Sequence, residues 1–165
     1  MRTQEFLANE QSRFLRTENR ELRTLLSETI QLEIVTPERL VVQDTVAEVQ
    51  IPGKNGYLGI LPGHAPLITE LSVGEISYRV NGFTHYLAVA WGFAEVLPTK
   101  VTILAETAER AEEIDVARAQ RAKEAAEKML HSTDPNTDFE RALAALKRAE
   151  VRLDVAAKRG AVATT

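Results

Sequence analysis

Residues 52–67 have the sequence PGKNGYLGILPGHAPL, in which four glycines and three prolines stand among apolar side chains. Glycine allows backbone conformations with positive φ, whereas proline fixes φ at about −65° and has no amide proton to donate. The stretch therefore excludes a helix and predicts tight turns around one short strand, residues 57–61. Turns on isolated soluble domains are usually polar. A loop with this many apolar residues therefore indicates a surface that contacts another molecule.

On both sides of this loop, short segments alternate polar and apolar residues as half-buried strands do. Such strands are predicted at residues 31–35, 40–42, 46–51, 75–80, 84–89, 93–97 and 100–105. Between two of them stands Asn81-Gly82, a pair suited to a two-residue type I′ hairpin turn because both positions need positive φ. Many short strands separated by turn residues predict an antiparallel β-sandwich or barrel over residues 32–106.

The composition changes at Thr107, beyond which alanine and charged residues dominate. Apolar residues three or four apart predict a first helix over residues 111–130. Thr137 and Glu140 then form a capping-box pattern that opens a second helix. The apolar stripe of that helix has the spacing of a coiled-coil seam: Phe139, Ala142, Leu146, Ala149, Leu153 and Ala156.

These two segments predict an antiparallel helical hairpin over residues 107–165, and with the sandwich they make an α+β chain. Small alanine side chains let the helices approach closely but bury little apolar area per residue. We therefore expect a hairpin of modest stability that can leave its resting place.

Composition excludes several classes of function. The net charge of −4 gives no reason to expect nucleic-acid binding, and the absence of cysteine excludes disulfides and thiol chemistry. Apolar runs are far shorter than the roughly 20 residues that a membrane-spanning helix needs. Any contact with a membrane is therefore expected to go through partner proteins.

The sequence also lacks the motifs of catalysis. The three histidines, His64, His85 and His131, are dispersed without the spacing of a metal site. Gly53-Lys54 does not fit a phosphate-binding loop, and no serine lies in a nucleophile elbow. We expect no catalytic residue, no metal site and no required cofactor, so the chain is not an enzyme on its own.

The glycines, prolines and histidine of residues 53–66 resemble the signature loop of the epsilon subunit of bacterial F-type ATP synthases (delta in mitochondria), and the resemblance extends over residues 32–157. It implies a rotor subunit whose sandwich touches the gamma subunit and the membrane rotor c-ring at the foot of the central stalk. Its hairpin would either fold down on the sandwich or extend to the alpha/beta catalytic hexamer and block ATP hydrolysis. The implied location is peripheral, on the cytoplasmic side of the bacterial plasma membrane. The residues expected to meet partner subunits are Gly56, Tyr57, Gly59, Leu61, Pro62, Gly63 and His64.

A second motif, Ile114-Asp-Val-Ala-Arg-Ala119, resembles a sequence that marks ATP binding in some bacterial epsilon subunits. The residues that the resemblance assigns to a regulatory ATP are Ile114, Asp115, Arg118, Ala119, Arg148 and Arg152. An aspartate at a helix start can cap the helix or accept a hydrogen bond from a nucleotide, and guanidinium groups suit phosphates. The same residues would also serve as a helix-start ion pair with a solvated stripe, or as a basic latch on an acidic partner surface.

The resemblance does not explain residues 1–31, whose apolar positions fall only loosely at helical spacing. They are expected to be a weakly helical or disordered extension, with an extra docking helix as the alternative. Two further functions stay open at the level of sequence. One is a free-standing module that senses ATP or another anion, and the other is a helical adaptor that uses the N-terminal segment.

Overall fold

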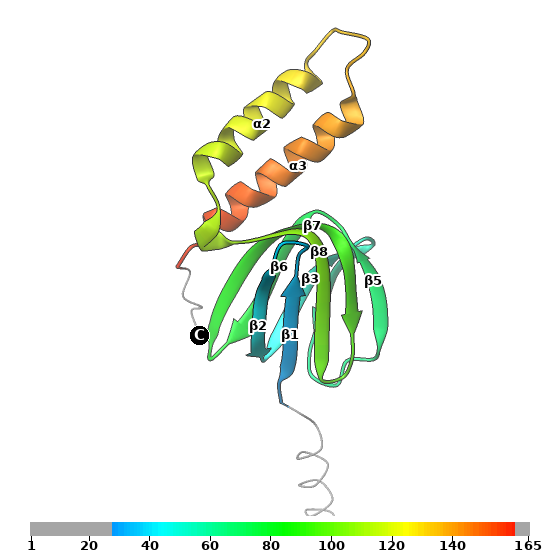
Figure 1. Cartoon of the computed structure of the whole chain (residues 1–165), viewed down its shortest axis with the longest axis vertical. Coiled ribbons are helices and arrows are strands. Elements are labelled where there is room, and N and C mark those ends of the chain that lie inside the picture. The colour runs from blue at the N-terminus through cyan, green and yellow to red at the C-terminus, as the bar shows by residue number, and fades with distance from the viewer. Residues whose placement is uncertain (1–27, 161–165) are drawn as a thin grey trace, which may run out of the picture.

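The computed structural model describes residues 28–160 of the 165-residue chain, as a sandwich of strands with a helical hairpin at one end (Figure 1). The elements are β1 (Ile30–Val35), β2 (Leu40–Val46), β3 (Glu48–Gly53), β4 (Gly56–Ile60), β5 (Leu67–Leu71), β6 (Gly74–Val80), β7 (Phe83–Val96), β8 (Lys100–Arg110), η1 (Ala111–Glu113), α2 (Val116–Leu130) and α3 (Phe139–Ala156). The extension predicted at residues 1–31 lies outside the described residues up to position 27. Its last two positions, Ile30 and Gln31, already belong to β1.

The long strands β7 and β8 pass through both layers of the sandwich. The first half of β7 pairs with β6, β6 pairs with β3, and β3 pairs with β4, while the second half of β7 pairs with β5. β8 lies antiparallel to β7 along its whole length, and β1 and β2 follow beyond it. Pairing is antiparallel except between β1 and β8, which run parallel.

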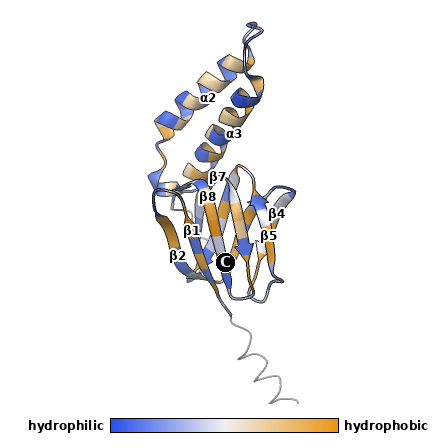
Figure 2. Ribbon diagram, turned by 45° about the vertical axis from the view of Figure 1, so that its right-hand side comes forward, coloured by the Kyte–Doolittle hydropathy of each residue, from blue (hydrophilic) through white to orange (hydrophobic). Residues whose placement is uncertain are grey.

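An aliphatic core fills the space between the two layers. Alternate residues of each strand point inward, as in β1, where Ile30, Leu32 and Ile34 are fully buried and the residues between them are not. Burying such a side chain stabilises the fold by about 1.5–3 kcal/mol. Every member of this core cluster falls between residues 30 and 108, so the sandwich has a core of its own. Figure 2 shows hydrophobic and hydrophilic residues mixed along the strands of the sandwich.

The Asn81-Gly82 hairpin prediction is confirmed, because the two residues join β6 to β7 with φ of 50° and 83°. Strand β5 was missed in the sequence, since its residues directly follow the last proline of the loop. Two predicted strands, 84–89 and 93–97, are one strand, β7, which bends at Trp91 and Gly92. β8 continues to Arg110, so the sandwich extends past the boundary predicted at residue 106.

The helical hairpin is present, but both helices begin later than predicted. Residues 111–113 form a single 3₁₀ turn, and α2 starts after Asp115, whose carboxylate accepts a hydrogen bond from the Arg118 amide at 2.9 Å. The predicted capping box at Thr137 is wrong. Asp138 caps α3 by accepting from the Arg141 amide at 2.9 Å, because the chain enters the helix one residue later.

The two helices meet through alanines, as the seam predicted. Ala119 and Ala126 of α2 and Ala142 and Ala149 of α3 are buried. Phe139, the first residue of the predicted stripe, is 45% exposed and is not among the buried residues of α3. No helix among residues 28–160 is long and apolar enough to cross a membrane.

Candidate functional site

The apolar loop ends in a type II turn at residues 61–64. The His64 amide donates to the Leu61 carbonyl oxygen at 3.1 Å, with Pro62 and Gly63 as the central residues. Gly63 has φ of 82°, which this turn type requires at that position. The Gly63 amide also donates to the Pro98 carbonyl oxygen at 2.8 Å. This bond fixes the loop to the turn between β7 and β8, at the end of the sandwich away from the hairpin (Figure 1).

Tyr57 is not at the tip of a loop. The tip of the β3–β4 hairpin is Lys54-Asn55, followed by Gly56 with φ of 130°. Tyr57 stands on β4, and its hydroxyl oxygen accepts a hydrogen bond from the Glu75 amide at 3.1 Å. The residue is still 56% exposed, so its side chain is held in place and also open to a partner.

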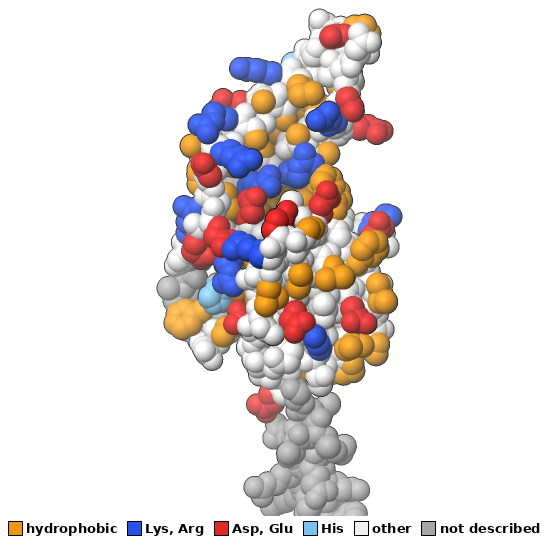
Figure 3. Space-filling model, in the orientation of Figure 1, with side chains coloured by type: hydrophobic (Ala, Val, Ile, Leu, Met, Phe, Trp, Pro, Cys, Tyr) orange, Lys and Arg blue, Asp and Glu red, His pale blue; other side chains and the backbone are white. Residues whose placement is uncertain are grey.

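A second apolar surface, not identified from the sequence, lies on the outer face of β5, β7 and β8. Phe93 of β7 stands opposite Leu104 of β8. Ile68 of β5 stands opposite Glu95 of β7, two residues along from Phe93, and is therefore its diagonal neighbour on the same face. The exposed fractions are 74% for Ile68, 56% for Phe93 and 57% for Leu104. We call these three residues the β5–β8 patch. In Figure 3, apolar side chains gather over this side of the sandwich.

Strand alternation carried a signal for this patch. In β7, Ala94 and Val96 are fully buried, so Phe93 must point outward. An aromatic side chain at an outward position indicates a contact surface. The signal was incomplete because the strand that carries Ile68 was not predicted.

The residues predicted to bind a nucleotide converge only in part. A pocket of about 250 Å³ lies where the hairpin meets the end of β8, and it is lined by Glu109, Glu113, Asp115, Arg118, Ala119, Ala122 and Arg152. Asp115, Arg118, Ala119 and Arg152 are therefore brought together. Ile114 is not, because it is 3% exposed and packs in an apolar cluster with Ala111 and Val155.

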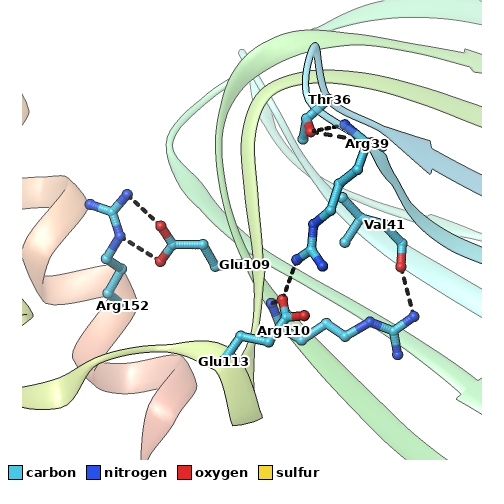
Figure 4. A network of polar contacts seen from close by, with 7 residues as sticks. All are labelled: Thr36, Arg39, Val41, Glu109, Arg110, Glu113 and Arg152. Carbon is cyan, nitrogen blue, oxygen red and sulfur yellow. Dashed lines mark hydrogen bonds and ion pairs between the residues drawn. The ribbon is translucent and has the colours of Figure 1, made fainter.

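The two arginines predicted to contact phosphate both have partners from the sandwich. Arg152 of α3 forms a two-pronged ion pair with Glu109 of β8, with Nε–Oε2 and Nη2–Oε1 distances of 2.8 and 3.1 Å (Figure 4). The guanidinium carbon of Arg148 lies 4.9 Å from the centre of the Trp91 ring. Neither Glu109 nor Trp91 was identified from the sequence, since each sits in a strand far from the hairpin along the chain.

A third acid beside the pocket is also paired. Glu113 accepts from Arg39 at 2.6 Å and from the Arg110 amide at 3.3 Å (Figure 4). The hydrogen bond from Arg39 lowers the pKa of the Glu113 carboxyl and raises the pKa of Arg39. With Glu109, Glu113 and Asp115 against Arg118 and Arg152, the pocket wall carries more acid than base.

Apolar contacts attach the hairpin at one end. Val155 and Ala156, at the end of α3, pack on Ala88 of β7 and on Ala111 and Ile114. Lys158 forms an ion pair with Glu75 at 2.6 Å and lies over the Tyr86 ring. Arg159 donates to the Ile114 carbonyl oxygen. The rest of the hairpin rises away from the sandwich (Figures 1 and 2).

Comparison with known proteins gives consistent matches over both parts of the chain. Residues 29–111 match the family model for the ATP synthase, Delta/Epsilon chain, beta-sandwich domain, and residues 112–157 match the model for its long alpha-helix domain. An ATP synthase epsilon chain of Koribacter versatilis is 70% identical over 110 residues, which cover 67% of this chain and 78% of that relative. One of Syntrophobacter fumaroxidans is 50% identical over 133 residues, covering 81% of this chain and 99% of that relative.

A solved structure is similar as well. A chain in the cryo-EM structure of the Euglena gracilis mitochondrial ATP synthase OSCP/F1/c-ring matches with a TM-score of 0.70 at 26% identity. The match covers 80% of this chain and 83% of that chain.

Proposed function

The chain belongs to the delta/epsilon chain family of ATP synthase, and we propose that it docks through its sandwich on the gamma subunit and the c-ring and regulates ATP hydrolysis through its hairpin. It is a structural and regulatory subunit, without catalysis of its own. Family membership favours this role over a free-standing anion sensor or a helical adaptor.

The β5–β8 patch is the observation that carries the docking proposal. Ile68, Phe93 and Leu104 are large, mostly exposed and adjacent on one sheet face. Contiguous exposed apolar side chains on a small domain mark a protein interface, and aromatic residues are enriched in the cores of such interfaces. We assign this patch to the gamma subunit.

The c-ring contact is assigned to the turn at residues 61–64 and its neighbours on β4. The turn is fixed to Pro98 at the end of the sandwich, where it presents Leu61 with 58% of its surface exposed. Gly56, Tyr57 and Gly59 lie on the adjoining strand β4. The subunit would thus meet one partner with its side and the other with its end. In this arrangement it sits peripherally on the cytoplasmic side of the bacterial plasma membrane and contacts the membrane only through the other subunits.

A matched pair of substitutions tests the patch. Phe93→Glu places a charge in the proposed interface, and Phe83→Glu places the same charge on a phenylalanine that is 53% exposed outside the patch. Burying an unpaired carboxylate is costly, so Phe93→Glu should weaken binding to purified gamma subunit by about tenfold or more. Phe83→Glu should bind as the parent chain does. Full affinity of Phe93→Glu, measured by calorimetry, would remove the patch from the interface.

The regulatory role of the hairpin rests on its limited attachment. The apolar contacts with the sandwich involve the end of α3, and the seam between the helices is made of alanines. With so small an apolar attachment, the hairpin can detach once its ion pairs with Glu109 and Glu75 open, and can then extend towards the alpha/beta hexamer, where it would block ATP hydrolysis. An assembled synthase whose subunit lacks the hairpin should therefore hydrolyse ATP faster than one with the full chain.

Regulatory ATP is a second proposal, favoured by the pocket that gathers Asp115, Arg118, Ala119 and Arg152. Asp115, Arg118 and Ala119 belong to α2 and its cap, Arg152 belongs to α3, and Glu109 of β8 also lines the pocket. ATP would therefore bind only to the folded hairpin and would stabilise it. At about 250 Å³ the pocket is at the small end for a ligand site, so side chains must move to admit a nucleotide. Calorimetric titration with MgATP tests the proposal, and Arg118→Ala should abolish any binding that the parent chain shows.

A further inference from the structure

Arg148 and Arg152 lie one helical turn apart on α3, and both reach the sandwich. Arg152 is held by Glu109 through two hydrogen bonds, in a geometry that suits guanidinium to a carboxylate or a phosphate. Arg148 lies against the aromatic face of Trp91 at 4.9 Å. The side chains of Arg152 and Glu109 are only 27% and 37% exposed, so water weakens this pair less than it would on an open surface.

Trp91 occupies an unusual backbone position. Its φ is 51°, a left-handed conformation that bulky side chains rarely adopt. The next residue, Gly92, has φ of 132°, and a Cβ atom there would lie 2.1 Å from the Leu104 carbonyl oxygen. The bend thus needs glycine at 92, and the bulkiest of side chains stands beside it at a strained position. Such strain persists when surrounding contacts compensate for it, and the contact with Arg148 is one that can.

We propose that Glu109 and Trp91 are a built-in ligand for the two arginines, which holds α3 against the sandwich when no nucleotide is present. Glu109 takes the place of an anion on Arg152, and the Trp91 ring takes the place of a planar ligand on Arg148. Strands β7 and β8 thereby supply the carboxylate and the aromatic ring that the two arginines would otherwise find in a bound molecule.

Competition for the arginines follows from this arrangement. An incoming phosphate must displace the Glu109 carboxylate from Arg152, since one guanidinium fork cannot serve both in the same geometry. The built-in ligand would therefore lower the affinity for anions and make the folded hairpin independent of nucleotide. The competition between phosphate and Glu109 rests on the proposed ATP site. The attachment of α3 by Glu109 and Trp91 is independent of that site.

We call the contacts of Glu109 with Arg152 and of Trp91 with Arg148 the α3 latch, and Trp91, the single tryptophan of the chain, reports on it by fluorescence. Fluorescence of the isolated full-length subunit, with acrylamide as quencher, measures how open the indole ring is. Trp91 is 40% exposed under Arg148, so Arg148→Ala should about double its quenching. Arg141→Ala removes an exposed arginine from the same helix without touching the Asp138 cap, which uses the backbone amide, and should leave quenching unchanged.

Charge reversal separates a latch from a passive contact. Glu109→Arg should repel Arg152, free α3 and raise Trp91 quenching, and adding Arg152→Glu should restore the parent value by re-forming the pair in reverse. The proposal is overturned if Glu109→Arg or Arg148→Ala leaves quenching at the parent value, or if the reversed pair fails to restore it.

A nucleotide titration tests the competition. Glu109→Gln keeps the shape of the side chain and removes its charge, so it should bind MgATP more tightly than the parent chain, while Glu106→Gln should not. Equal affinity of Glu109→Gln and the parent chain would overturn the competition. If MgATP binds to neither protein, the nucleotide site is wrong, and the quenching experiments, which contain no nucleotide, still decide whether the latch exists.

Discussion

Tyr78 carries a hydroxyl group into an aliphatic core. Its side chain is 2% exposed, its ring stacks on His85 with centroids 5.2 Å apart, and its hydroxyl donates to Asp44 at a long 3.5 Å. Burial disfavours the phenolate and raises the pKa of Tyr78 to about 12. The neutral phenol is thus the form that the fold accepts.

A pH dependence follows at this residue. The pKa of an unfolded tyrosine is about 10, so between pH 10 and 12 the unfolded chain releases a proton that the folded chain retains, and stability falls as pH rises. The stabilisation is complete below pH 10, and about 2–3 kcal/mol is lost by pH 12. In urea unfolding across this window, Tyr78→Phe should show a shallower fall than the parent chain. Identical slopes for both proteins would contradict the buried phenol.

Gly92 lies where β7 bends and has no room for a side chain. Gly92→Ala combines a φ of 132° with a Cβ atom 2.1 Å from a backbone oxygen, so the bend in β7 must shift. We expect a loss of about 3 kcal/mol or more in the free energy of unfolding. The matched control is Gly59→Ala, where an added Cβ meets nothing within 4 Å. Comparable urea midpoints for the two variants would show that the bend tolerates a side chain.

Helix α3 has two candidate N-cap residues, Thr137 and Asp138. The capping-box pattern pointed to Thr137, whereas the Asp138 carboxylate makes the bond to the Arg141 amide. Asp138→Ala should therefore cost about 1 kcal/mol and lower the helical signal of the hairpin on heating, while Thr137→Ala should cost much less. A larger loss of stability for Thr137→Ala than for Asp138→Ala, measured by circular dichroism melts, would instead identify Thr137 as the N-cap.

Elements with a strong local signal could be predicted from sequence. Asn81-Gly82 gave the hairpin, and the alanine spacing gave the seam, because each depends on neighbours in the chain. β5 was missed because a short strand after a proline-rich loop is stabilised by its pairing with β7, which lies far along the sequence. The parallel pairing of β1 and β8 has the same origin.

The candidate sites divide in the same way. Asp115 could be recognised as a helix-start residue from its position alone, and the structure places it there as the cap of α2. Glu109 and Trp91 could not be recognised, since their partners are fixed only when α3 lies on the bend of β7 and the end of β8. The β5–β8 patch likewise forms only when three strands come side by side.

At the scale of the whole molecule, the sandwich and the hairpin are separable. The sandwich core ends by residue 108, and β8 ends at Arg110. Glu113 holds Arg39 of the sandwich, so a chain that ends at Glu113 keeps every strand pair and this ion pair. A chain that ends at residue 106 would instead lose the pairing of β8 with Leu87–Ala90 of β7.

The most direct test of the account is steady-state ATP hydrolysis by the assembled synthase, without a proton gradient, containing either the full chain or the chain that ends at Glu113. Both subunits should join the complex in equal amounts, because the patch and the loop are intact in both. We predict that the complex without the hairpin hydrolyses ATP severalfold faster, since the blocking element is gone. Equal rates at equal incorporation would contradict the claim that the hairpin regulates the enzyme.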